Sequence, residues 1–234
     1  MKGMFWFIAV VIMGFSCKKE SSTNERIIKE YAFESGTDGW EAGFADYPYP
    51  LADETIYEFD SGYAALPDGL NNNAKGLKIG GHNRSDDLFM FWRKRVANLG
   101  PNQRYAVTIE VEMASQYPEN SVGIGGSPGS SVFMKAGAAI IKPTTKIDDS
   151  QWLRMNIDKD NQSGGGQDMQ VLGNIGIPGD AYKHQIIRRN NTGKVFEVTA
   201  DSTGSLWLIV GTDSGYEGLT IIYYDRIMYT FTPV

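Results

Sequence analysis

The sequence has few of the residues that most often build metal centres: it contains one cysteine and two histidines among 234 residues. A single cysteine cannot form an internal disulfide, so the fold must hold without one. His82 and His184 lie far apart in the chain and lack the short spacing of zinc ligands. Glycine-rich phosphate-binding and dinucleotide-binding patterns are also absent. The sequence therefore names no reaction, and it favours a non-catalytic role over an enzyme.

The cysteine, Cys17, follows a short apolar segment at the N-terminus. Lys2 gives a positive start, and residues from Met4 to Phe15 are apolar or glycine. This is the pattern of a signal peptide, and it is too short to span a bilayer as a stable anchor. The segment resembles the lipobox of bacterial lipoproteins, although Gly14 stands where leucine is usual. The resemblance implies that Cys17 is the lipid attachment site; the alternative is an ordinary secretory signal.

Three parts follow from this reading. Residues 1–16 are the lipoprotein signal peptide, residues 17–26 are the lipidated cysteine with a flexible polar tether, and residues 27–234 form a single domain. We expect the protein at the bacterial outer membrane or cell surface, with the domain in the periplasm or outside the cell. The membrane contact would then be made through the lipid anchor alone.

Acidic residues outnumber basic ones. The whole chain has 22 Lys and Arg against 28 Asp and Glu, a net charge of −6. Without residues 1–16 the charge is −7, because Lys2 is the only charged residue among them. An acidic domain argues against a nucleic-acid partner.

Apolar residues recur with a period of two along most of the chain. In Arg104–Met113, for example, the apolar side chains fall on one face and the charged ones on the other. Further strands are expected at 29–34, 55–60, 76–81, 88–96, 132–141, 151–157, 169–175, 183–189, 194–200, 206–210 and 221–231. Glycine, asparagine, aspartate and proline separate these short strands. The pattern predicts an all-β fold, a two-sheet antiparallel β-sandwich of the jelly-roll type.

The two ends of the domain resemble galactose-binding-like carbohydrate-binding modules. Tyr31–Trp40 has their Phe-Glu, Gly and Gly-Trp opening pattern, and Tyr223–Tyr229 has an Asp before an alternating apolar run, as in their closing strand. The likeness covers fewer than about 20 residues, and the family could be a separate one that shares only this fold. In those modules the first and last strands often share a structural calcium ion. The resemblance implies that Glu34 and Asp225 would hold it here, although no cofactor is required.

One predicted strand has the make-up of a sugar-binding surface. In residues 151–157, Trp152, Arg154 and Asn156 share one face, which Asp158 continues. An indole can stack on a sugar ring while polar neighbours bond its hydroxyl groups. We therefore expect a carbohydrate ligand here, provided that Trp152 is open to solvent. The alternative is that another segment covers Trp152.

Other cations share strand faces with aromatic residues. Arg93 and Arg95 share a face with Phe89 and Phe91, and Lys135 shares a face with Phe133. If these cations border the same groove as Arg154, the ligand would be an acidic polysaccharide, because arginine binds carboxylates in a bidentate manner.

Two other functions remain open. Val132–Ala138 is similar to the Phe-Lys-Ala-Gly strand of jelly-roll alginate-lyase-type enzymes, which implies a polysaccharide lyase or hydrolase. The tyrosine and histidine that such lyases use as acid and base are missing at the matching positions. The other alternative is a structural or protein-binding lipoprotein without a sugar site.

Overall fold

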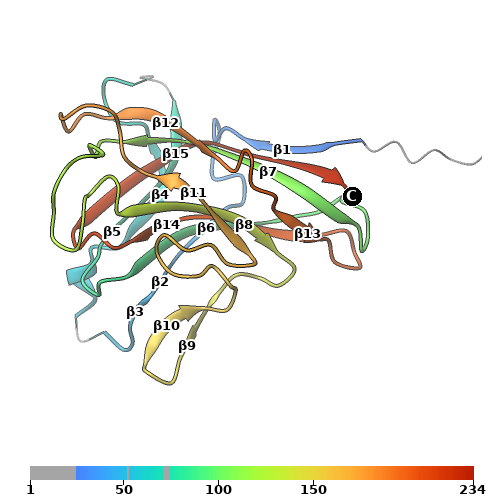
Figure 1. The fold of residues 1–234 in the computed structure, drawn as a ribbon, viewed down its shortest axis with the longest axis horizontal. Coiled ribbons are helices and arrows are strands. Elements are labelled where there is room, and N and C mark those ends of the chain that lie inside the picture. Colours follow the sequence, from blue (N-terminus) through green and yellow to red (C-terminus); the bar gives the residue numbers. More distant parts are fainter. Residues whose placement is uncertain (1–24, 52, 71–73) are drawn as a thin grey trace, which may run out of the picture.

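The computed structural model describes residues 25–51, 53–70 and 74–234 (Figure 1). The expected signal peptide, Cys17 and the tether up to Asn24 lie outside these residues. Within the described part, no helix is long and apolar enough to cross a membrane.

Two antiparallel sheets form the body of the molecule. The seven-stranded sheet has the order β12 (Gln185–Asn190), β7 (Arg104–Ser115), β15 (Leu219–Pro233), β5 (Lys75–His82) and β4 (Asp60–Ala65), with β1 (Ile27–Tyr31) beside β15 and β13 (Glu197–Thr199) beside β7. The five-stranded sheet has the order β11 (Met169–Asn174), β8 (Val132–Ala139), β14 (Leu206–Ser214), β6 (Leu88–Val96) and β2 (Glu41–Ala45). The predicted all-β sandwich is confirmed.

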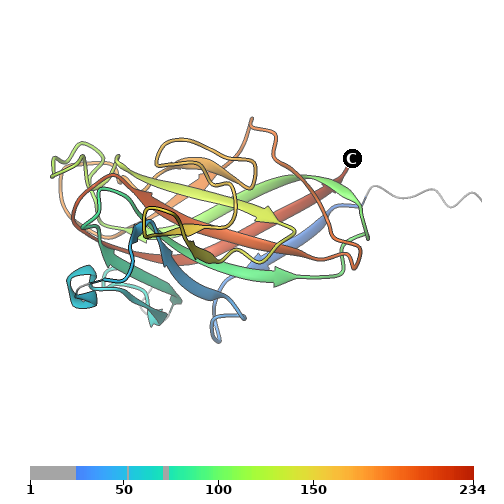
Figure 2. The ribbon, with the colours of Figure 1, turned by 90° about the horizontal axis from the view of Figure 1, so that it is seen from below.

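The main core lies between these two sheets. Along β7, Val107, Ile109 and Val111 are buried while Thr108 is exposed, as the alternation predicted. β1 pairs with the end of β15, so Ile27 lies opposite Phe231 near the C-terminus (Figure 2). The chain therefore closes with its first and last strands side by side.

A third, three-stranded sheet was not predicted. This outer sheet consists of β3 (Tyr47–Pro48), β10 (Trp152–Met155) and β9 (Thr145–Ile147), and Figure 1 shows β9 and β10 outside the two main sheets. Met155 and Ile157 pack with Phe89, Phe91 and Ile209, which face away from the main core. The five-stranded sheet is therefore covered on both faces over part of its area. We call the outer sheet together with residues 156–161, which follow β10, the outer layer.

The predicted strand at 55–60 was wrong. Residues Glu54–Tyr57 form a short 3-10 helix instead, and the next strand, β4, starts at Asp60. The carboxylate of Asp53 accepts a hydrogen bond from the backbone N–H of Thr55 at 2.9 Å, which caps the helix. Local capping overrides the alternation of apolar residues here.

Gly137 shows how closely the start of β11 approaches β8. A Cβ atom at this position would lie 1.9 Å from the carbonyl oxygen of Asp168, inside any allowed contact. The backbone N–H of Ala138 donates a hydrogen bond to the same oxygen at 3.0 Å. Asp168 directly precedes β11, whose Met169 pairs with Gly137, so the two strands meet here in close contact.

Candidate functional site

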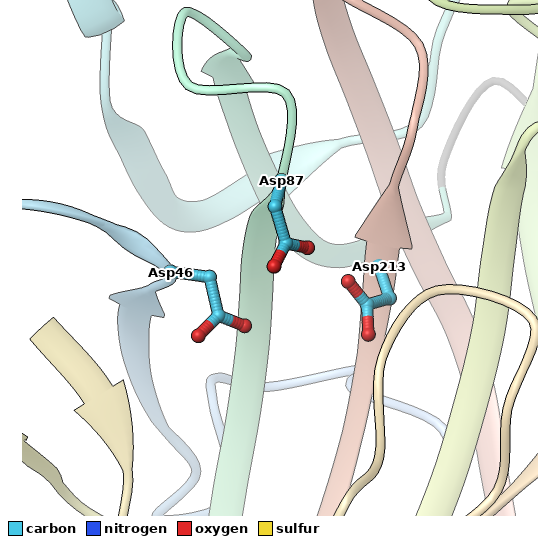
Figure 3. Close-up of side chains that lie close together, drawn as sticks. All are labelled: Asp46, Asp87 and Asp213. Atoms are coloured by element: carbon cyan, nitrogen blue, oxygen red, sulfur yellow. The ribbon is translucent and has the colours of Figure 1, made fainter. Parts of the chain in front are cut away.

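Three aspartates from separate parts of the chain meet beneath the outer sheet. Asp46 directly follows β2, Asp87 directly precedes β6, and Asp213 lies on β14. One carboxylate oxygen of each lies within 4.8 Å of the other two, and Figure 3 shows the three carboxyl groups turned toward one another. We call these residues the acidic cluster.

Three cations compensate the acidic cluster. Lys135 lies 2.7 Å from Asp213, and Lys159 lies 2.8 Å from both Asp213 and Asp46. Arg154 contacts Asp46 at 3.0 Å and Asp87 at 3.1 Å. These contacts match three carboxyl groups with three positive groups.

The pKa of Asp87 is raised to about 7, because burial disfavours its charged form and the negative charges of Asp213 and Asp46 lie nearby. Burial also acts to raise the pKa of Asp213, but the two lysines outweigh it and the pKa is lowered. The pKa of Lys135 is lowered by burial, despite its contact with Asp213. Asp87 is therefore the group of the cluster that can hold a proton near neutral pH.

Two oxygens of the cluster are buried without a hydrogen-bond donor among the described residues: Oδ1 of Asp87 and Oδ1 of Asp213. A buried acceptor without a donor is costly. A proton on Asp87 relieves this cost by bonding the Asp213 carboxylate, and that interaction contributes to the raised pKa of Asp87. Oδ2 of Asp46 also lacks a well-aligned hydrogen bond, but Lys159 lies 2.8 Å away and supplies its counter-charge.

The acidic cluster has the spacing of a metal site, yet its cation positions are filled by side chains. The ammonium groups of Lys135 and Lys159 both contact Oδ2 of Asp213. A divalent cation would have to displace these groups or sit beside them against their charge. The donor set therefore fits an ion-pair network and not a metal centre.

A pocket of about 360 Å³ opens beside the cluster. Asp46 and Asp87 line it from the five-stranded sheet, and Arg154 and the segment Asp158–Asn161 line it from the outer layer. Met155 and Ile157 add apolar surface. Hydrogen-bond donors, hydrogen-bond acceptors and apolar side chains thus line the same pocket.

The row predicted on residues 152–158 is only partly available to a ligand. The side chain of Trp152 is half-buried, and the guanidinium of Arg154 lies over its ring. Asn156 uses its amide within the chain, accepting from the Thr144 N–H at 2.8 Å and donating to the Lys142 carbonyl at 3.0 Å. Asp158 lines the pocket while one of its oxygens accepts from the Gln167 N–H.

The predicted open basic groove is not formed. Arg93 bonds Glu41 at 3.1 Å and the carbonyl of Pro143, while Arg95 lies 3.7 Å from Asp201. Lys135 is fully buried, so its expected role in sugar binding was wrong. The sequence placed each of these cations on a strand face that it shares with phenylalanine. It did not show that the outer sheet and residues 156–161 cover part of that side, or that a carboxylate meets each cation.

Glu34 and Asp225 line one pocket of about 450 Å³, as expected from the pairing of the first and last strands. Neither carboxylate has a hydrogen bond or ion pair within the described chain. Lys75 and Arg226 line the same pocket and oppose a cation there. Burial and the charge of Glu112 raise the pKa of Asp225. Calcium binding by these two residues stays a prediction.

The loop between β7 and β8 contains, at Gly125–Gly129, the Gly-x-Ser-x-Gly motif found in the nucleophile elbow of hydrolases. The required strand–turn–helix context is missing. Ser127 instead organises the loop: its Oγ accepts from the N–H groups of Gly129 and Ser130, both at 3.1 Å, and donates to the Glu119 carbonyl at 3.0 Å. This serine is a turn residue.

Sequence reasoning missed Asp46 and Lys159 as members of the site. Asp87 and Asp213 were likewise not among the residues expected to form the site. The available signal was position: Asp46 and Asp87 adjoin strand ends that are otherwise apolar, and Asp213 continues a strand that is buried on both faces.

Comparisons with known proteins relate this chain to solved structures at low sequence identity only. No protein-family model matches the sequence, and no curated protein matches it. A carbohydrate-binding module of the β-sandwich superfamily, described for its promiscuous specificity, aligns with a TM-score of 0.40 and 13% identity over 84% of this chain and 59% of its own. The mannan-recognising module TmCBM27 aligns with a TM-score of 0.40 and 11% identity, covering 88% and 98%.

A third solved structure, the Stig cyclase Fisc from Fischerella sp. TAU, aligns with a TM-score of 0.38 and 11% identity over 89% of this chain and 100% of its own. Binding modules and an enzyme thus resemble this chain to the same degree. The likeness is confined to the β-sandwich architecture, and it does not decide between binding and catalysis.

Proposed function

We propose that the protein binds a carbohydrate at the pocket beside Arg154 and does not cleave it. The observation behind this proposal is the convergence of Arg154, Asp87 and the polar segment Asp158–Asn161 on one pocket. Sugar hydroxyl groups both donate and accept hydrogen bonds. A carboxylate can accept from them and a guanidinium can donate to them. Trp152 does not itself line the pocket, but its indole lies under Arg154, which does, and could contact a ligand that extends past Arg154.

The charges around the pocket favour a neutral sugar over the acidic polysaccharide expected from the sequence. Four carboxylates line it, those of Asp46, Asp87, Asp158 and Asp160, against Arg154 and Lys159. Both cations are already paired with Asp46. An acidic ligand would have to break these pairs or approach unpaired carboxylates.

The arrangement of the acids argues against glycoside hydrolysis. Such enzymes place two carboxyl groups on either side of the scissile bond. Asp213 is fully buried and Asp46 is 2% exposed, so the cluster does not offer such a pair to a substrate. The pocket lining contains neither tyrosine nor histidine, which a lyase would need as acid and base.

A glycan array probed with the purified full chain tests this function. We expect binding to neutral glycans that weakens by about tenfold or more in Trp152→Ala, because a lost stacking contact costs about 1.4 kcal/mol or more. Trp207→Ala is the matched control, since Trp207 is also half-buried and lies under a cation, Lys142, at 5.0 Å. Unchanged binding in Trp152→Ala, or equal loss in both variants, contradicts the proposed site.

A further inference from the structure

Lys135 and Asp213 form a fully buried pair on neighbouring strands. Lys135 lies opposite Gly211 in the pairing of β8 with β14, and Asp213 follows two residues later on the same face. Both side chains are 0% exposed, and Nζ of Lys135 lies 2.7 Å from Oδ2 of Asp213. We propose that these two side chains condense into an amide bond, which cross-links β8 to β14.

The contact holds the reacting atoms in place. A 2.7 Å distance to one carboxylate oxygen puts the nitrogen at about 3–3.5 Å from the carboxyl carbon, the range from which attack proceeds. Lys135 also donates to the backbone carbonyls of Lys159 at 3.0 Å and Asp160 at 3.3 Å. Because both side chains sit on paired strands beneath the outer layer, neither can move away from the other.

Two neighbouring side chains supply the chemistry of the step. Asp87 adjoins Asp213 and holds a proton near neutral pH, so it can give this proton to Oδ1 of Asp213 and take a replacement from Lys135. Lys159 contacts Oδ2 of Asp213 at 2.8 Å, where it stabilises the negative charge that develops on this oxygen during attack. Burial lowers the pKa of Lys135 and so favours the neutral amine that attacks.

The atoms and charges balance without an oxidant or a co-reactant. Nζ of Lys135 forms a bond to Cγ of Asp213, and the bond from Cγ to Oδ1 breaks. Of the three ammonium hydrogens, one stays on the amide nitrogen and two leave with Oδ1 as water. Asp87 ends in the protonation state in which it began. The water can leave through the adjacent pocket, which Asp87 lines.

The amide also removes the free-energy cost of burying the charges of Lys135 and Asp213. An ammonium and a carboxylate that are both withdrawn from solvent are replaced by one neutral amide. Lys159 and Arg154 keep their contacts with Asp46, and Arg154 also keeps its contact with Asp87. The amide N–H still donates a hydrogen bond to the carbonyl oxygen of Lys159. Oδ1 of Asp213, the buried oxygen that lacked a donor, leaves as water.

Peptide mapping of the purified, denatured full chain tests the cross-link directly. Trypsin cannot cleave after an acylated Lys135, so residues 105–146 stay intact and remain joined to residues 195–226. We expect this branched peptide at the summed mass of its two parts less one water, with fragments that place the bond at Lys135 and Asp213. Separate peptides, with cleavage after Lys135, overturn the proposal, and so does a bond formed by Lys159.

Two variants test the assigned roles. Lys135→Arg keeps the charge but cannot form the amide, so the branched peptide should vanish. Asp87→Asn should slow its formation by about 10²-fold or more, as expected for loss of a proton-transfer group. Asp86→Asn, at the exposed neighbouring position, is the matched control and should cross-link as the parent does. Unchanged cross-linking in a folded Asp87→Asn chain, monitored by circular dichroism, removes Asp87 from the step.

Discussion

The guanidinium carbon of Arg154 lies 4.6 Å from the centre of the Trp152 ring. The two residues are separated by one position on β10, so their side chains leave the strand on the same side. Arg154 also contacts Asp46 and Asp87 at the edge of the five-stranded sheet. The side chain of Arg154 thus connects the half-buried Trp152 with the buried acidic cluster.

Arg154→Ala should destabilise the fold. The substitution leaves Asp46 and Asp87 without the guanidinium between them, and both carboxyl groups are largely buried. A cost of about 2–3 kcal/mol is expected after allowance for the partial exposure of Arg154. Urea unfolding measures the change. Arg95→Ala is the control, because Arg95 is mostly exposed and its carboxylate partner is 3.7 Å away; an equal loss in both variants contradicts the role of Arg154.

Gly137→Ala should weaken the pairing of β11 with β8. The added methyl group would overlap the carbonyl oxygen of Asp168, so the start of β11 must shift. Overpacking of this kind costs about 1–3 kcal/mol. Thermal unfolding followed by tryptophan fluorescence gives the measurement. Gly62→Ala on β4 meets no atom within 4 Å and should have a much smaller effect; equal midpoints for the two variants contradict the prediction.

Glu112→Gln should show a stability loss that depends on pH. Hydrogen bonds from Arg226 and Arg188 lower the pKa of Glu112 against the effect of burial. A lowered pKa means that the unfolded chain takes up the proton first, so this stability is present at neutral pH and fades as the pH falls below about 4.

We expect a cost of about 1–2 kcal/mol at pH 7, from the loss of charged hydrogen bonds on a partly exposed face. Denaturant unfolding at pH 7 and pH 3.5 tests it, and the difference between Glu112→Gln and the parent should shrink at the lower pH. Glu30→Gln removes a more exposed partner of Arg226 and should cost less than half as much. A pH-independent difference for Glu112→Gln would falsify the assignment.

Calcium binding by Glu34 and Asp225 predicts a metal-dependent melting temperature. A site filled to 100 times its dissociation constant stabilises the fold by about 2.7 kcal/mol. Calcium should raise the midpoint of the parent, a chelator should reverse the rise, and Glu34→Gln should abolish it. Asp60→Asn, which loses a surface contact with Lys78, serves as the control. A midpoint insensitive to calcium and chelator rules out the ion.

Lipid attachment at Cys17 predicts a change of compartment on substitution. Incorporation of a labelled fatty acid should be lost in Cys17→Ser, and the variant should leave the membrane fraction, because the acyl chains supply about 0.8 kcal/mol for each buried methylene. Ser16→Ala is the neighbouring control. Cys17→Ser that remains in the membrane fraction indicates another means of attachment.

Much of the fold followed from alternation, and its failures have local causes. The alternation in Arg104–Met113 correctly placed the buried face of β7 because this strand packs on one side only. It failed at 55–60, where the Asp53 cap turns the chain into a 3-10 helix. Of the outer sheet, alternation predicted β10 as part of 151–157, but it missed Tyr47–Pro48 and Thr145–Ile147, which are too short to show a period.

The sequence by itself determined that this is an acidic β-sandwich, and it determined which side chains leave each strand on the same face, because successive residues in a strand point to opposite sides. It could not determine what packs on a face. Only the tertiary structure decided that residues after Ile141 fold back over the five-stranded sheet and bury Lys135, and that β8 pairs with β14, which brings Lys135 to Asp213. Asp46, Asp87 and Asp213 meet for the same reason: side-chain direction is a local property of the backbone, whereas burial and ion pairing depend on contacts between distant segments.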